Sequence, residues 1–254
     1  MVLGWLRKSK EKDTGTQSAE LPWGPDDEII ANSVIGNLRE NLLEAMKDDK
    51  GVHTESLMVA IGAIAGYSAA YMIWETLIRP GKAQLMKDLH VLQGADGKSY
   101  YSGDMLNAIL LPQAGSSHTT WEFVATGAMQ AGAPQAELPD IEEIFAHIAG
   151  TIGSDDFGRV RAPDDHQPVF TPYEALHAVW PRTRELFSSM QVPGAVGRSL
   201  AIEHWPVVAA IVAQQYIVMA RDVLDPRLSA QIVMESAVAM SKIDPITVPD
   251  EYPA

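Results

Sequence analysis

Eight polar residues have side chains that could bind a ligand or take part in proton transfer, and they fall in three segments of the chain. They are Tyr100, Tyr101, Asp104, Asp155, Asp156, His166, Glu203 and His204. Imidazoles exchange protons near neutral pH, and tyrosine hydroxyls donate hydrogen bonds. If the segments 100–104, 155–166 and 203–204 met around one pocket, they would form a binding or catalytic site. The sequence assigns a catalytic role to none of them.

Glu203 and His204 directly precede Trp205 and Pro206 at the entrance to a long uncharged stretch. A proline inside a helix removes the hydrogen bond to the carbonyl four residues earlier, which here is that of Ile202. A buried polar group without a partner costs about 1–3 kcal/mol. These groups must therefore either pair with their neighbours or line a wet pocket, and we predict the pocket.

Two patterns raise the question of a metal ion. The segment 154–166 holds four aspartates, which can bind Ca²⁺ or Mg²⁺, but the spacing of an EF-hand loop is absent. Aspartates in turns usually accept hydrogen bonds from the backbone instead. Glu174 and His177 have the E-x-x-H spacing of di-iron bundles, but the chain has no second copy of that motif. The sequence therefore predicts no metal site and no cofactor.

The standard motifs of nucleotide-binding proteins and hydrolases are absent from the chain. Two classes of function stay open. The first is a soluble helical protein that acts through protein–protein contacts, of which a homo-oligomer is one form. The alternative is an enzyme or small-ligand-binding protein whose pocket is built from the three segments above.

The composition narrows the choice of partners. The 254 residues contain no cysteine and carry a formal net charge of −14. Residues 1–12 sum to +3, so the rest of the chain sums to −17 and repels the phosphates of nucleic acids. We expect a cytoplasmic protein with a flexible polar and basic tail over residues 1–20. Weak membrane contact by residues 1–10, which hold Trp5 ahead of basic residues, stays open.

An uncharged run from Leu57 to Trp74 is nearly long enough to cross a membrane. Its side chains are small, and Gly62, Gly66 and Ala69 fall on one stripe of a helix, where a second helix can approach closely. We therefore predict a buried helix of a soluble protein and no integral membrane segment. Residues 205–220 form a second uncharged run that would pack beside the first.

The fold class predicted from these signals is all-α. We expect a multi-helix bundle with two central apolar helices, 57–79 and 205–224, and one short β-hairpin near 90–103 as its only strand candidate. Prolines at 25, 139, 172 and 226 are expected to start helices, and Thr119 and Thr171 each begin a capping box. Residues 21–254 are expected to form a single helical domain. The alternative is two helical halves, 21–135 and 136–254, joined around 150–170.

Overall fold

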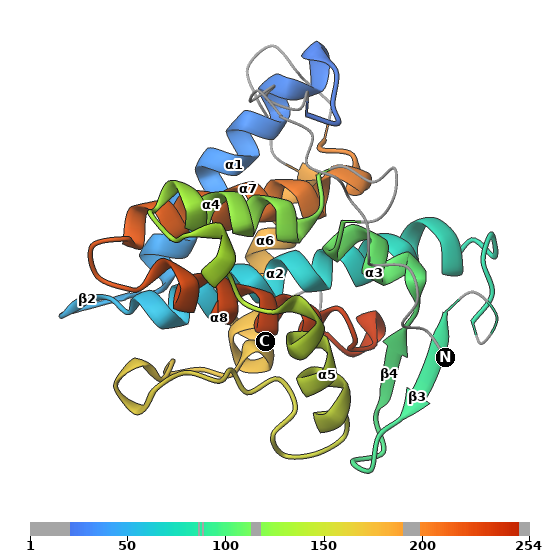
Figure 1. Ribbon diagram of the computed structural model, residues 1–254. Coiled ribbons are helices and arrows are strands. Elements are labelled where there is room, and N and C mark those ends of the chain that lie inside the picture. Colours follow the sequence, from blue (N-terminus) through green and yellow to red (C-terminus); the bar gives the residue numbers. More distant parts are fainter. Residues whose placement is uncertain (1–20, 86, 88, 113–117, 190–198, 249–254) are drawn as a thin grey trace.

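The computed structural model describes residues 21–85, 87, 89–112, 118–189 and 199–248. This part of the chain contains eight α-helices and two short strand pairs (Figure 1). The helices are α1 (Pro25–Ala45), α2 (Thr54–Ile73), α3 (Asp104–Leu110), α4 (Thr120–Gln130), α5 (Ile141–Thr151), α6 (Pro172–Ser189), α7 (Trp205–Ala220) and α8 (Pro226–Met240). The strands are β1 (Lys47–Asp48), β2 (Gly51–Val52), β3 (His90–Gln93) and β4 (Ser99–Ser102). The structure is thus a helical bundle with a small hairpin, as the sequence predicted.

Helix α2 is the centre of the bundle. Every residue from Ser56 to Tyr71 is buried, and α6, α7 and α8 pack around it. A π-helical turn, Trp74–Ile78, continues α2, so the predicted helix 57–79 changes type in its last turn. The segment Thr54–Ile78 is long and apolar enough to cross a membrane, but 94% of its apolar window is buried inside the protein.

The small residues of α2 allow a close contact with α8, as their spacing indicated. A Cβ atom added to Gly66 would lie 2.6 Å from the carbonyl carbon of Ala237, and one added to Gly62 would lie 2.9 Å from the Cβ of Ser236. Both distances are shorter than van der Waals contact. The backbones of α2 and α8 therefore approach closely because neither glycine has a side chain.

Helix α7 is the second uncharged helix, and α1 and α4 pack against it. It begins at Trp205, so Pro206 lies in its first turn, where the missing N–H has no helical partner to lose. Helix α8 packs against α2 more extensively than α7 does. The prediction of two central helices thus omitted a third, α8, whose alanines and serines place it against the glycines of α2.

The helix starts follow local sequence chemistry at most sites. Thr119 forms a capping box with Glu122, and Thr171 exchanges the equivalent hydrogen bonds with Glu174. The expectation for residue 139 was wrong, because Asp140 is the N-cap of α5 and its carboxylate accepts the N–H groups of Glu142 and Glu143. The side-chain carboxylate of Asp140, and not the proline before it, thus sets the start of this helix.

The predicted hairpin near 90–103 is present as the antiparallel pair β3–β4, in which Val91 lies opposite Tyr101. Strand β4 also contacts the segment after α8, because the N–H of Tyr101 donates to the carbonyl of Lys242 at 2.6 Å. The pair β1–β2, two residues on each side, was not predicted.

Helices from both halves of the chain pack against one another, since α2 packs against α7 and α8. The predicted tail, residues 1–20, lies outside the described residues.

Candidate functional site

The two candidate tyrosines are buried parts of the hairpin. The hydroxyl of Tyr100 donates to Asp96 at 2.8 Å, and its ring meets that of Phe157 edge to face. Burial and the neighbouring Asp96 raise the pKa of Tyr100 to about 12. Tyr101 stacks on Trp74, and burial together with Asp244 raises its pKa above the usual range. Both hydroxyls therefore stay protonated near neutral pH.

The candidate aspartates are exposed to solvent. Asp104 is the first residue of α3, after an N-cap at Gly103, and its side chain does not cap the helix. Asp155 and Asp156 lie on the surface of the segment after α5, where Asp156 is 3.9 Å from the guanidinium of Arg159. Among the described residues, no group of three or more potential ligands could hold a metal ion.

Glu203 and His204 form the last part of a 3-10 turn, Ile202–His204, that leads into α7. Glu203 is exposed, while the half-buried ring of His204 meets Trp23 edge to face. The carbonyl of Ile202 accepts the N–H of Trp205. The predicted unpaired acceptor is therefore absent, because the chain tightens to a 3-10 turn before the proline.

The structure brings two of the three predicted segments together and leaves the third, 203–204, apart from His166. Tyr100 contacts Phe157, so segments 100–104 and 155–166 meet there. His166 contacts Glu55 in the first turn of α2, whereas Trp205 stacks on Tyr71, sixteen residues further along the same helix. At about 1.5 Å per residue this separation is roughly 24 Å, so His166 and the 203–204 segment do not share one small pocket.

A different feature stands out: the segment 153–171, which we call the anchored loop, is fixed to the helical core by side chains of α8 and α2. In Figure 1 it is the yellow to gold segment along the lower edge. The first anchor is Glu235, which lies in the buried face of α8 with no exposed surface. Its carboxylate accepts the backbone N–H of Arg161 at 2.6 Å and the Nε of Arg161 at 2.7 Å.

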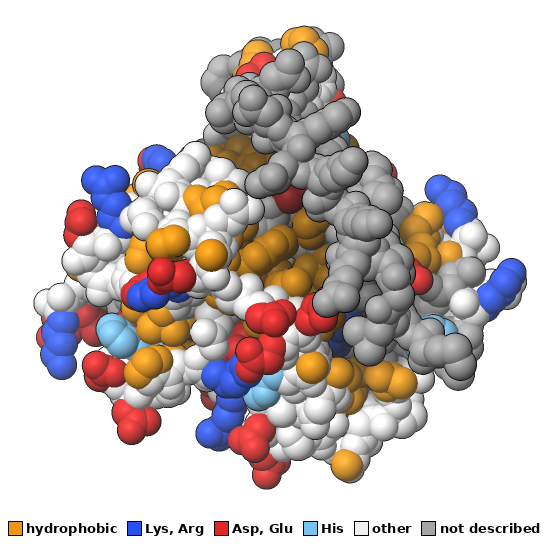
Figure 2. All heavy atoms as spheres, viewed as in Figure 1, with side chains coloured by type: hydrophobic (Ala, Val, Ile, Leu, Met, Phe, Trp, Pro, Cys, Tyr) orange, Lys and Arg blue, Asp and Glu red, His pale blue; other side chains and the backbone are white. Residues whose placement is uncertain are grey.

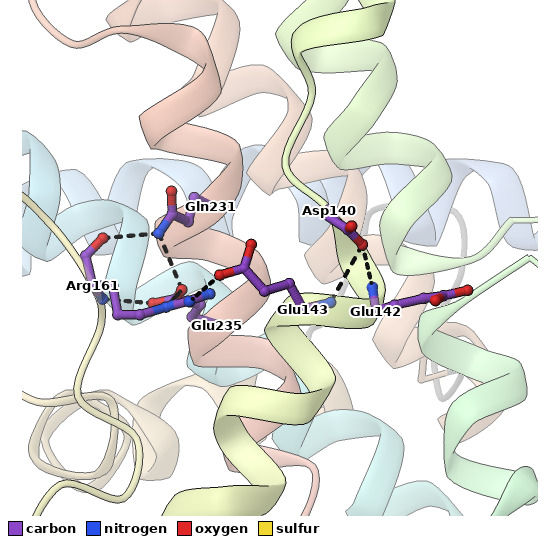
Figure 3. A network of polar contacts seen from close by, with 6 residues as sticks. All are labelled: Asp140, Glu142, Glu143, Arg161, Gln231 and Glu235. Carbon is purple, nitrogen blue, oxygen red and sulfur yellow. Dashed lines mark hydrogen bonds and ion pairs between the residues drawn. The ribbon is translucent and has the colours of Figure 1, made fainter.

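The contacts around Arg161 form a closed network (Figure 3). Gln231, one turn before Glu235, donates to the carbonyl of Arg161 at 2.9 Å and to Glu235 at 3.1 Å. The guanidinium also binds Glu143 of α5 at 2.7 Å. Burial opposes the charge of Arg161, but the hydrogen bonds with both glutamates raise its pKa. A buried carboxylate is tolerated only when it is paired and hydrogen-bonded, and Arg161 meets that need.

The second anchor is the first turn of α2. The Nδ1 of His166 lies 2.7 Å from a carboxylate oxygen of Glu55. The N–H of Val169 donates at 2.9 Å to the hydroxyl of Ser56, which is buried. That hydroxyl also lies 3.1 Å from the Nδ1 of His53, the N-cap of α2. The hydrogen bond with Glu55 raises the pKa of His166, since the nearby carboxylate favours the protonated imidazole.

Between these anchors and α6, the loop presents apolar side chains to solvent. Val169 is 65% exposed and Phe170 is 43% exposed. They border a cavity of about 180 Å³. Its lining comprises Arg159, Val160, Gln167, Pro168, Val169, Phe170, Thr171, Pro172 and Glu174. Fixed backbone, exposed apolar groups and an adjoining cavity are together suited to contact with another molecule.

Charge around the loop is predominantly negative. Asp155, Asp156, Asp164 and Asp165 are exposed, and Arg159 is the exposed cation among them. The face drawn in Figure 2 shows acidic side chains along its lower part, with basic ones interspersed. The loop thus combines the exposed apolar residues Val169 and Phe170, which we call the apolar tip, with exposed acidic residues elsewhere in the loop.

Comparison of the chain with protein-family models, with curated proteins and with solved structures finds no match. The function of the protein must therefore be inferred from the geometry of this chain.

The sequence indicated His166 as a candidate but not the groups that hold it and its loop, Glu55 and Glu235. Glu235 is the only acid in the stretch from 228 to 243, which is otherwise apolar or uncharged apart from Lys242. A single carboxylate in such a helix was the signal that it is buried and paired. Val169 and Phe170 lie between a proline and a threonine in a polar loop. This pattern does not show from the sequence alone whether the two side chains are buried or exposed.

Proposed function

We propose that this protein binds another protein through the anchored loop, and that the partner presents an apolar side chain flanked by basic residues. The observation that carries the proposal is Glu235, a fully buried carboxylate that accepts both the backbone N–H and the side chain of Arg161. Burying a charge costs stability unless it is well paired. Glu235 occupies a core position but serves to hold a surface loop. This use of a buried charge supports the view that the conformation of the loop is important for function.

Preorganisation is what an anchored loop contributes to binding. A loop that must order itself when a partner arrives loses affinity to conformational entropy. Here Arg161, His166 and Val169 are each bonded to a helix of the core, so the apolar tip is already in place. Binding groups are often found on loops that a rigid framework positions.

The chemistry of the partner follows from the surface of the loop. Val169 and Phe170 offer an apolar contact beside the cavity, which accepts a side chain of moderate size. The four exposed aspartates favour basic residues on either side of that side chain. The net charge of −14 adds a long-range attraction for a basic partner.

The test uses a labelled peptide with this chemistry, KKLFKK, and measures fluorescence anisotropy at low and high salt. We expect saturable binding that weakens as salt screens the charges. The control peptide KKGGKK keeps the charge without the apolar anchor, and EELFEE keeps the anchor with opposite charge. Neither should bind comparably. Sedimentation of the protein alone is measured in parallel, because a homo-oligomer formed through the loop would compete with the peptide.

Variants separate binding at the loop from binding elsewhere. Phe170→Ser should weaken KKLFKK binding at least tenfold, which is about 1.4 kcal/mol. Met219→Ser is the matched control, because Met219 is an apolar side chain on α7 that is 56% exposed. Equal affinity of both variants, or equal binding of KKGGKK and KKLFKK by the wild type, would contradict the proposal.

A further inference from the structure

Helices α1 and α6 enclose another cavity, which shares no lining residue with the cavity at the anchored loop. Its volume is about 270 Å³. This volume is just below the usual range for drug-sized ligands, so it suits a ligand of roughly ten non-hydrogen atoms. The floor of the cavity is buried and consists of Leu38, Leu42, Val179, Thr183 and Leu186.

The floor has no polar side chain in need of a partner. The hydroxyl of Thr183 donates to the carbonyl of Val179 at 2.9 Å, and the other side chains of the floor are aliphatic. Ala45 on α1 and Ala178 on α6 are exposed at the rim, and their small side chains leave the mouth of the cavity open. A buried polar group without a partner costs stability. The part of a ligand that fills this cavity is therefore apolar.

The polar groups that the rim offers to a ligand are acceptors. Glu44 is exposed and has no hydrogen bond or ion pair with any described residue. The amide nitrogen of Asn41 donates to the carbonyl of Asn37 at 2.7 Å, which leaves the amide oxygen as an acceptor. Arg182, the cation of the lining, is paired with the carboxylate of Glu185. The rim therefore complements a donor that carries positive charge.

We propose that the cavity between α1 and α6 binds a small primary amine with an apolar body, whose ammonium group lies at the rim beside Glu44 and Asn41. An ammonium has three donors, enough to bind a carboxylate and an amide oxygen together. The apolar body is removed from water against the leucines of the floor, which favours binding. The net charge of −14 adds a long-range attraction for a cation.

An anion fits this cavity less well than an amine. A carboxylate at the rim would lie near Glu44 and would compete with Glu185 for Arg182. A neutral alcohol fits the floor equally well but has no charge to pair with Glu44. The charge of the ligand is therefore the variable that a test must isolate. This binding is independent of the function proposed for the anchored loop, because the two cavities have separate linings.

The experiment measures the binding of phenethylamine to the full-length wild-type protein by isothermal titration calorimetry at neutral pH and low salt. Two probes of nearly the same shape are the controls: phenethyl alcohol, which is neutral, and phenylacetate, which is an anion. We expect saturable binding of the amine that is about tenfold tighter than the binding of either control. Binding of the amine that is no tighter than that of the alcohol, or that does not saturate, would overturn the proposal.

Two substitutions of exposed alanines locate the bound amine. Ala178→Phe places a ring in the mouth of the cavity, and because Ala178 is exposed the fold tolerates it. This variant should weaken binding of phenethylamine about tenfold. Ala146→Phe is the matched control, because Ala146 is an exposed alanine on α5 that does not line the cavity. Equal affinity of the two variants would place the amine elsewhere and overturn the proposal.

The role of Glu44 is tested by removing its charge while its shape is kept. Glu44→Gln should weaken binding of phenethylamine about fivefold and leave that of phenethyl alcohol unchanged. Glu40→Gln is the control, because Glu40 is an exposed carboxylate of the same helix outside the cavity. An equal loss in both variants would contradict a contact at the rim, because it would reflect the overall charge of the protein.

Discussion

Glu235 binds Arg161 through both of its carboxylate oxygens, one of which accepts the backbone N–H and the other the Nε of the guanidinium. The two residues are 74 positions apart, and one is in a core helix while the other is in a loop. This contact fixes the path of the chain at the middle of the loop. This contact, together with the contacts of His166 and Val169 with α2, fixes the position of the apolar tip at Val169 and Phe170.

Removing the Glu235 carboxylate should loosen the loop. Glu235→Ala leaves the N–H of Arg161 and its guanidinium without their buried partner, which should lower the free energy of unfolding by about 2–3 kcal/mol. Urea denaturation measures that change. Glu143→Gln is the matched control, since Glu143 binds the same guanidinium but its side chain is 67% exposed, and it should cost well under 1 kcal/mol. Equal costs would show that burial does not distinguish the two contacts.

The close approach of α2 and α8 should be sensitive to one added methyl or isobutyl group. Gly66→Leu would overpack the contact with Ala237 and should cost about 1–3 kcal/mol or more. Gly36→Ala in α1 is the control, because an added Cβ there meets nothing within 4 Å and alanine favours the helix by roughly 0.5–1 kcal/mol. A thermal midpoint unchanged by Gly66→Leu would mean that the two helices do not touch at this position.

The pair of His166 and Glu55 should make the stability depend on pH. The pKa of His166 is raised in the folded protein, so the contribution is complete below about pH 6.5 and is lost as the pH rises through the folded value. The difference in unfolding free energy between wild type and Glu55→Gln should therefore be larger at pH 6 than at pH 8.5.

A double-mutant cycle isolates this pair, because every other residue is common to all four proteins. In a His166→Gln background, the substitution Glu55→Gln should lose its dependence on pH over the same range. If the dependence persists without His166, another group near Glu55 titrates instead.

Local signals predicted the helices well because they act over a few residues. The capping boxes at Thr119 and Thr171 and the proline at 226 start helices as expected. The small residues of α2 indicated a close helix contact, because a stripe of glycine and alanine on a buried helix lets another helix approach closely. The run 205–220 was predicted to pack beside the run 57–74, and α7 does so, but the glycine stripe itself faces α8. The sequence does not distinguish these two neighbours, because α7 and α8 are both apolar.

The site was harder to predict because its contacts join residues far apart in the chain. His166 and Glu55 are 111 positions apart, and neither carries a motif that names the other. Pro206 misled the prediction at Glu203 and His204, because a 3-10 turn satisfied the carbonyl that the proline was expected to leave unpaired. Such local rearrangements depend on packing, here of Trp205 against Tyr71, and packing is a property of the whole fold.

We propose that the loop binds a partner because Glu235 holds it in place, and the affinity of KKLFKK for Glu235→Gln measures how far binding depends on that contact. Glu235 does not line the cavity at the loop tip, so it acts on the peptide only through the position of the loop. We predict that Glu235→Gln weakens binding at least fivefold while Glu143→Gln and Met219→Ser leave it unchanged. Wild-type affinity in Glu235→Gln, with circular dichroism confirming the fold, would contradict the claim.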